Sequence, residues 1–313
     1  MSHFKSKTLN YKMVNSPLPV HRRKYSAEYN ENRTERYEQK TTEKYQQENK
    51  RLCSKYENIK IFHRTDFSKV YTAIEKRTGA EIILKEIPKK YVTMEEYNGG
   101  HVPKEFKFQK MAAEKTNCVL PPVDLFERKG SFIIAMEKPA DYMDLHSIIS
   151  TYAPMDETSS LKILAKVVEA CKQLQDAGIQ HRDIKPGNIL MHLKSLEIKI
   201  IDFGCAELTE KVTQTTADNQ VGTLLFLPPE WYSHEHAYNP EIVTTWALGS
   251  IFYQLLIKCW DFQDGTLERD REFEMEHIPR KSIFIINRTL CDFRFRIKIS
   301  DLLNLTRQTL AQL

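Results

Sequence analysis

The sequence predicts an α+β protein made of two lobes, a small β-rich lobe followed by a larger helical one. Of the 313 residues, 41% are apolar and 10% are aromatic, which is enough to bury a core. This composition excludes wholesale disorder, a collagen-like chain and a coiled-coil rod. Strand-like stretches dominate the part that begins at Tyr56, and helical periodicity dominates the rest. A β-rich segment followed by a helical one is typical of the α+β class.

The first 55 residues differ from the rest in charge. They hold 13 Lys and Arg against 6 Asp and Glu, a net charge of +7, whereas the remainder carries −3. The segment has few aliphatic residues and no glycine, which favours a solvated or partly helical tail, and we predict that residues 1–55 are disordered. The alternative is a basic arm that binds an acidic partner, an anionic membrane or nucleic acid. The cluster Arg22-Arg23-Lys24 is too short to be a strong nucleic-acid signal.

Regular elements follow from Tyr56. Turn signals such as Thr78-Gly79 separate four strand-like stretches: Asn58–Phe62, Lys69–Ile74, Glu81–Ile87 and Ser131–Glu137. In Leu161–Ala177 the apolar residues recur at steps of three and four, which predicts a helix, and Gly178 fits the position after its end. The stretch Val243–Trp260 is apolar on nearly all sides and predicts a buried core helix.

Two short motifs carry the chemistry. The run His181-Arg182-Asp183-Ile184-Lys185-Pro186-Gly187-Asn188 follows a predicted helix. Fourteen residues after Asn188 comes Asp202-Phe203-Gly204, preceded by the strand Ile198–Ile201. Carboxylate and amide oxygens held on loops suit Mg²⁺, which shares its coordination with phosphates. Asp183, a further carboxylate, can accept a proton from a hydroxyl, a division of labour suited to phosphoryl transfer.

These motifs resemble the catalytic loop H-R-D-x-K-x-x-N and the metal-binding D-F-G of the eukaryotic protein kinases. The resemblance implies the two-lobed protein kinase fold over residues 56–306, with an N-lobe over 56–137 and a C-lobe over 140–306. It also implies transfer of the γ-phosphate of ATP to Ser or Thr hydroxyls of protein substrates, with ATP and Mg²⁺ as cofactors. Serine/threonine specificity is indicated by Lys185, two residues after Asp183, and by Thr223.

The resemblance also assigns roles to residues. Asp183 accepts the hydroxyl proton, Lys185 stabilises the transferred phosphate, and Asn188 and Asp202 hold the metal. In the strand Glu81-Ile82-Ile83-Leu84-Lys85, Lys85 resembles the lysine that contacts the phosphates. Glu105 is its expected ion-pair partner, with Glu114 as the fallback. The remaining predicted nucleotide contacts are Phe62, Val70, Met136 as gatekeeper, and Glu137 in the hinge.

Several details resemble the Pim-like serine/threonine kinases. These are Val102-Pro103 before Glu105, the hinge Met136-Glu137-Lys138-Pro139, the run Pro228-Pro229-Glu230-Trp231, and Thr244 where most kinases have an acid. Proline lacks a backbone N–H, so Pro139 removes a donor that most kinases offer to adenine. Pim-like kinases prefer basic peptides. Asp144 remains from their acidic residues, but it fits equally well as the N-cap of a helix His146–Thr151.

One motif is broken. The chain has 10 glycines, about half the usual share, and the first is Gly79, so the glycine-rich phosphate loop expected before Lys85 has none. Counting back from Val70 places His63, Thr65 and Ser68 at its glycine positions, and Asp66 adds a negative charge. Glycine serves there because backbone must approach phosphate closely. The alternative function is therefore a pseudokinase scaffold with weak or no ATP turnover.

The remaining predictions concern regulation and environment. Glu230 is expected to pair with Arg296, and Arg182 with a phosphate or an acid in the activation segment, where the candidates are Thr213, Thr215, Thr216 and Asp218. Cys205 is expected to be a small buried residue rather than a redox switch. The six cysteines form no CxxC pair, and no apolar run of signal-peptide or membrane-spanning length occurs. We therefore expect a cytoplasmic or nuclear monomer with reduced thiols and no membrane span.

Overall fold

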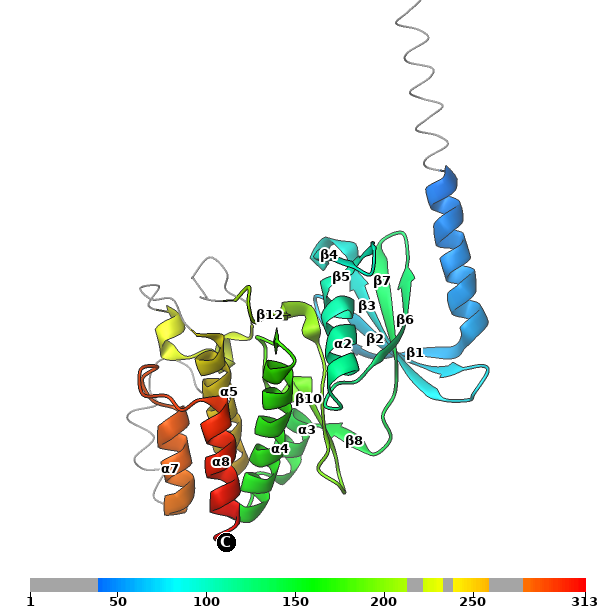
Figure 1. The fold of residues 1–313 in the computed structure, drawn as a ribbon. Coiled ribbons are helices and arrows are strands. Elements are labelled where there is room, and N and C mark those ends of the chain that lie inside the picture. The colour runs from blue at the N-terminus through cyan, green and yellow to red at the C-terminus, as the bar shows by residue number, and fades with distance from the viewer. Residues whose placement is uncertain (1–38, 213–221, 233–238, 259–277) are drawn as a thin grey trace, which may run out of the picture. The chain divides into compact units, whose positions relative to one another are not determined.

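The computed structural model describes residues 39–212, 222–232, 239–258 and 278–313 (Figure 1). A helix over residues 39–55 precedes the first strand, so the prediction of a disordered tail over residues 1–55 is wrong for residues 39–55, and residues 1–38 lie outside the described part. The chain divides into two compact units after Arg51, and the second unit contains every other element described below.

The first part of the second unit is an antiparallel sheet of five strands, in the order β1-β2-β3-β7-β6. Its strands are β1 (Tyr56–Arg64), β2 (Lys69–Glu75), β3 (Glu81–Pro88), β6 (Pro122–Glu127) and β7 (Ser131–Glu137). The four strands predicted from the sequence are thus confirmed. Strand β7 is buried at every residue except Glu137, because it lies inside the sheet, whereas β1 at the edge is buried only at Tyr56.

Helix α2 (Lys104–Lys115) follows a short hairpin that the sequence analysis did not predict. The hairpin consists of β4 (Met94–Tyr97) and β5 (Gly100–Pro103), and its turn is Asn98-Gly99. Both turn residues have positive φ, 50° and 77°, as the tight turns favoured in hairpins require. The Lys107 ammonium lies 3.0 Å from Glu95, so the hairpin is tied to α2.

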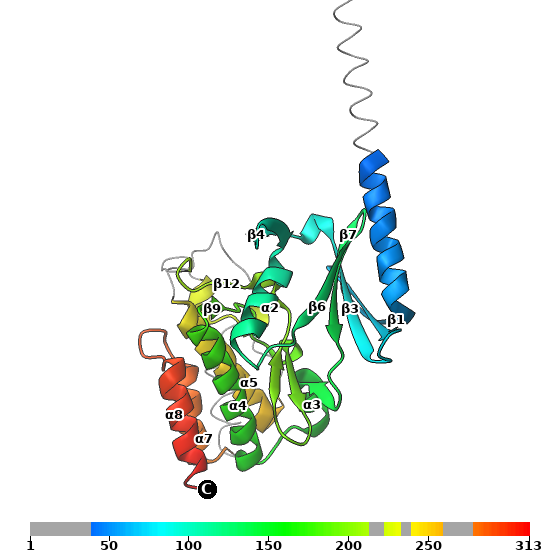
Figure 2. The same ribbon diagram turned by 45° about the vertical axis from the view of Figure 1, so that its right-hand side comes forward.

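Helices form most of the second part, and α4, α5 and α8 lie side by side in both views (Figures 1 and 2). They are α3 (Leu145–Tyr152), α4 (Glu157–Asp176), α5 (Pro240–Ile257), α7 (Arg280–Thr289) and α8 (Ile299–Leu310). The predicted helix over Leu161–Ala177 is confirmed as part of α4, and Gly178 follows it with a φ of 78°. Helix α5 confirms the buried core helix predicted over Val243–Trp260, although it ends at Ile257 and residues 259–260 lie outside the described part.

Short strands and 3-10 turns make up the rest of the described structure. A three-stranded sheet has the order β11-β10-β8, and β9 pairs with β12. These strands are β8 (Tyr142–Asp144), β9 (Ile179–Gln180), β10 (Ile189–His192), β11 (Ile198–Ile200) and β12 (Glu207–Leu208). The 3-10 turns are η1 (Lys89–Tyr91), η2 (Pro186–Asn188), η3 (Phe203–Cys205), η5 (Leu224–Phe226) and η6 (Pro229–Tyr232). A β-rich first part and a helical second part confirm the predicted α+β class.

Two helices approach so closely that one position excludes any side chain. A Cβ atom built on Gly249 of α5 would meet the Thr289 hydroxyl oxygen, and it would lie 2.6 Å from the Thr289 Cβ. Thr289 is fully buried, and its hydroxyl already donates to carbonyls of α7, so it has little room to move. Glycine at 249 is therefore required by the contact between α5 and α7.

We expect Gly249→Ala to lower the free energy of unfolding by about 1–3 kcal/mol, the usual cost of overpacking a core. Chemical denaturation of the two proteins measures this. The matched control is Gly130→Ala, in the turn between β6 and β7, where an added Cβ would meet nothing within 4 Å. Equal stabilities of Gly249→Ala and wild type would contradict the required close approach.

No helix among the described residues is both long enough and apolar enough to span a membrane.

Candidate active site

One face of the five-stranded sheet carries the predicted nucleotide contacts. Val70 on β2 is directly opposite Lys85 on β3, and Ile83 is opposite Met136 on β7. Directly opposed residues point to the same face, and so do residues two apart in one strand. Val70, Lys85 and Met136 therefore share a face, with Met136 buried and Val70 half-buried.

Two further predicted contacts occupy different environments. Glu137 ends β7 and is exposed, and the next amide, that of Lys138, donates to the Glu81 carbonyl at 2.8 Å. Phe62 lies where the pairing of β1 with β2 shifts register, between Ile61 and His63, and its side chain is 67% exposed. The structure thus leaves Phe62 exposed on the edge strand, in contrast to the buried Met136.

Lys85 is the centre of a partly buried charge cluster. Its Nζ lies 2.6 Å from Glu105 of α2 and 2.9 Å from Asp202, which precedes η3. The predicted Lys85–Glu105 ion pair is therefore confirmed. Glu114, the alternative partner for Lys85, is excluded because it accepts a hydrogen bond from the hydroxyl of Tyr97 instead.

The cluster shifts the pKa of each member. Burial by itself lowers the pKa of Lys85, but the charges of Glu105 and Asp202 outweigh it, so this pKa is raised overall. Burial would raise the pKa of Asp202, yet the Lys85 ammonium holds it below its ordinary value. For Glu105 burial dominates and raises the pKa. At neutral pH the ammonium remains charged between its two acidic partners.

A second cluster surrounds Asp183. One carboxylate oxygen accepts hydrogen bonds from the backbone N–H and the hydroxyl of Thr223, both at 2.8 Å. The other lies 2.8 Å from Lys185 Nζ and accepts from Asn188 Nδ2 at 3.0 Å. Lys185 also donates to the Thr223 hydroxyl at 2.6 Å. The three predicted catalytic residues are thus brought together, and Thr223 joins them.

His181 anchors this loop to the strand below it. Its Nε2 lies 3.0 Å from the carbonyl oxygen of Ile201 and must donate there, while Nδ1 accepts from the Asp183 N–H at 3.3 Å. Its ring packs edge-on against Phe203. These partners require a neutral imidazole, and burial holds the pKa of His181 below its ordinary value despite the nearby Asp183 and Asp202.

We expect the buried neutral His181 to make folding sensitive to mild acid. The unfolded chain protonates this group below about pH 6.5, whereas the folded chain does not, so stability is complete above that pH and falls below it. The contribution reaches at most about 1.4 kcal/mol per pH unit. Denaturation of wild type and His181→Gln at pH 7.5, 6.5 and 5.5 measures it. The variant, which cannot titrate, should show the shallower slope, and parallel slopes would contradict the prediction.

Asn188 and Asp202 offer the oxygens of the predicted metal site. Asn188 uses its amide nitrogen on Asp183, which leaves its Oδ1 for a metal, and its carbonyl accepts from Ile201 N at 3.0 Å, close to Asp202. Among the described residues no group of three or more His, Cys, Asp or Glu side chains forms a metal site. One carboxylate and one amide oxygen fit Mg²⁺, which takes its remaining ligands from phosphates and water.

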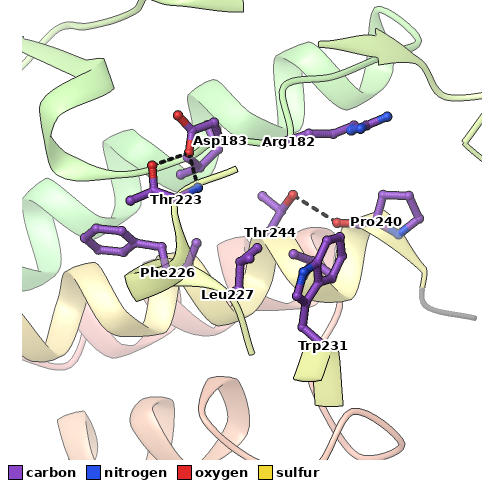
Figure 3. A pocket seen from close by; sticks show the side chains of 11 residues that line it. Arg182, Asp183, Thr223, Phe226, Leu227, Trp231, Pro240 and Thr244 are labelled. Carbon is purple, nitrogen blue, oxygen red and sulfur yellow. Dashed lines mark hydrogen bonds between the residues drawn. The ribbon is translucent and has the colours of Figure 1, made fainter. Parts of the chain in front are cut away.

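A small pocket of about 30 Å³ lies between the catalytic loop and α5 (Figure 3). Its walls include Arg182, Asp183 and Thr223 on one side and Thr244 on the other. The Thr244 hydroxyl donates to the Pro240 carbonyl of its own helix, at 3.0 Å. Thr244, which stands where most kinases have an acid, therefore bonds within α5. The pocket lies between Thr244 and the catalytic loop.

A buried ion pair between η6 and Arg296 confirms another prediction. Arg296 donates to both carboxylate oxygens of Glu230, at 2.5 and 3.0 Å, and its side chain is completely buried. It also donates to the carbonyl of Cys291 and lies over the ring of Trp246. A buried, bidentate pair of this kind is costly to break by removing one partner. It fixes η6 against the start of α5.

Gln109 is a positioning residue that the sequence analysis missed. This buried side chain of α2 donates to the Leu120 carbonyl at 2.6 Å and to the sulfur of Met136 at 3.1 Å. It thereby ties the helix that carries Glu105 to the strand that carries Met136. Its position four residues after Glu105, on the same helix face, was the only available signal.

Other predicted residues have structural partners or lie outside the described part. Asp144 caps α3 by accepting from the N–H and the hydroxyl of Ser147, at 2.8 and 2.7 Å, which confirms the N-cap interpretation. Cys205 is half-buried rather than buried, and burial raises the pKa of its thiol, which disfavours the reactive thiolate. The candidates for activation lie outside the described residues: Thr213, Thr215, Thr216 and Asp218.

Comparison with known proteins identifies the family. The model of the protein kinase domain matches residues 56–309, so the chain belongs to the protein kinase family. Over 210 residues it is 29% identical to serine/threonine-protein kinase pim-2 of Danio rerio, covering 64% of this chain and 66% of that protein.

Two mouse proteins extend the comparison. The chain is 31% identical over 210 residues to the PAS domain-containing serine/threonine-protein kinase, covering 65% of this chain and 15% of that protein. It is 29% identical over 226 residues to 3-phosphoinositide-dependent protein kinase 1, covering 71% of this chain and 39% of that protein. The chain thus matches only a minor part of either mouse protein.

Proposed function

We propose that this chain is an ATP-dependent, Pim-like serine/threonine protein kinase. The observation that carries the proposal is the double charge cluster. Lys85 is held between Glu105 and Asp202, and Asp183 is held by Lys185, Asn188 and Thr223. Electrostatic groups that are positioned before the reaction supply most of the catalysis in phosphoryl transfer.

The residues divide the reaction between them. Lys85 orients the nucleotide's phosphates, and Glu105 keeps its ammonium at the sheet face. Asp183 accepts the proton of the attacking Ser or Thr hydroxyl, with its carboxylate oriented by the two hydrogen bonds from Thr223. Lys185 is placed beside that carboxylate, where it counters charge on the transferred phosphoryl group. Asn188 and Asp202 would hold Mg²⁺, whose charge neutralises the phosphate oxygens.

The Pim-like assignment rests on local features of the chain. They are Val102-Pro103 before Glu105, the Pro139 hinge and the Pro228-Pro229-Glu230-Trp231 run, together with the 29% identity to the Danio rerio pim-2 kinase. We propose a weaker preference for basic peptides than the Pim-like resemblance implies, because Asp144 is engaged as a helix cap.

One specific observation favours the alternative of a pseudokinase scaffold. The end of β1 and the turn that follows it have His63, Thr65 and Ser68 where kinases have glycine. A side chain at these positions hinders the close approach of backbone to phosphate. If the chain is a pseudokinase scaffold, replacing Asp183 should leave the rate of phosphate transfer unchanged at background level.

We expect wild-type protein to transfer radiolabelled phosphate from Mg·ATP to a Ser/Thr peptide library, and Asp183→Asn to lose at least about 100-fold of that rate. The matched control is Asp176→Asn, which alters an exposed ion pair with Lys172 at the end of α4. Its rate should equal that of wild type. Equal, background-level incorporation by wild type and Asp183→Asn would refute the enzyme and favour the scaffold.

A further inference from the structure

The turn between β1 and β2 is closed by its own side chain. Thr65 N–H donates to the Ser68 carbonyl at 2.9 Å, which makes Asp66-Phe67 a two-residue loop. The Thr65 hydroxyl oxygen accepts hydrogen bonds from the backbone N–H of Phe67 at 3.2 Å and from that of Ser68 at 3.0 Å. Two consecutive amides at the tip of the hairpin thus share one side-chain acceptor.

These amides lie where a kinase's phosphate loop covers the nucleotide. Val70, two residues beyond Ser68, is directly opposite Lys85, so the hairpin leads onto the sheet face that carries the phosphate-binding lysine. A phosphate oxygen and a threonine hydroxyl are both acceptors, and a backbone N–H has a single hydrogen to donate. An amide bonded to Thr65 must give up that bond before it can bind a phosphate.

A ring contact holds the same turn. The Phe67 ring packs edge-on against Tyr91 of η1, with centroids 5.2 Å apart, and the Lys90 ammonium lies 4.6 Å from the Tyr91 ring centroid. Phe67 is nevertheless 63% exposed, so the contact anchors the tip to the first turn after β3 without burying it. The turn is therefore held by interactions at both its base and its tip.

We propose that Thr65 sets the nucleotide affinity of this site by competing with the phosphates for the amides of Phe67 and Ser68. The inference rests on the proposed function, because it assumes that the ligand is a nucleoside polyphosphate. Thr65 occupies a position where kinases have glycine, which has no side-chain acceptor. In the nucleotide-free turn its hydroxyl oxygen occupies the two amides that would otherwise be open to a phosphate.

The β2–β3 turn provides a matched control. There the Thr78 hydroxyl accepts from the Ala80 N–H at 3.2 Å, which is the same kind of bond at the opposite end of β2. Replacing either threonine by valine keeps the side-chain shape and removes the acceptor. Only the change at Thr65 should alter nucleotide binding.

The experiment measures the binding of Mg·ATP, Mg·ADP and adenosine by calorimetry to the full chain carrying Thr65→Val, Thr65→Ser or Thr78→Val. Thr65→Val should bind ATP and ADP about fivefold more tightly than wild type, the net worth of roughly one hydrogen bond, and should bind adenosine equally. Thr65→Ser keeps the acceptor, so it and Thr78→Val should match wild type. In nucleotide-free protein, hydrogen exchange at Phe67 and Ser68 should be faster in Thr65→Val than in wild type.

The outcomes separate this inference from the proposed function. An unchanged ratio of ATP to adenosine affinity in Thr65→Val, or unchanged exchange at the two amides, overturns the role of Thr65 even if wild type transfers phosphate. Tighter ATP binding by Thr65→Val in a chain that transfers no phosphate supports the role of Thr65 and refutes the kinase activity. Failure of every variant to bind ATP overturns both.

Discussion

The Lys85 ammonium, held between two carboxylates, is the interaction on which the rest of the site depends. Lys85 and its two partners come from three separate elements: β3 carries Lys85, helix α2 carries Glu105, and the loop before η3 carries Asp202. A charge removed from water without a partner costs several kcal/mol, so an arrangement that separates Lys85 from Glu105 and Asp202 is strongly disfavoured. The sheet, α2 and the Asp202 loop must therefore be positioned together.

Other contacts reinforce the placement of α2. Lys104 at its first turn lies 3.1 Å from Glu207 of β12, and Lys107 reaches Glu95 of the β4–β5 hairpin. On its inner side Gln109 bonds to the Leu120 carbonyl and to Met136. The helix is thus held from the hairpin, from the sheet and from the segment after η3. These contacts restrain the position of Glu105 without contacting the reacting groups.

At two positions where kinases usually have an acid or a glycine, this chain has a threonine that hydrogen-bonds to nearby backbone groups. Thr244 bonds within its own helix and is separated by a pocket from the catalytic loop, which is instead held by His181 and Thr223. Thr65 closes the β1–β2 turn that lacks glycine. In both places a short polar side chain satisfies nearby backbone groups, as Ser, Thr, Asn and Asp commonly do in turns and at helix ends.

The sequence by itself determined the fold class and the main strands and helices, because periodicity and ordered motifs are local signals. The pairs Lys85–Glu105 and Glu230–Arg296 were implied by the resemblance to protein kinases, and the structure contains both. The hairpin around Asn98-Gly99 was not predicted, although an Asn-Gly pair is a strong local signal for a two-residue hairpin turn. Only the tertiary structure decided that Asp144 is a cap, that Gln109 joins α2 to Met136, and that Thr65 occupies two amides. Those roles depend on which donors and acceptors lie within about 3 Å in space, and distances of that kind are set by packing between elements rather than by spacing along the chain.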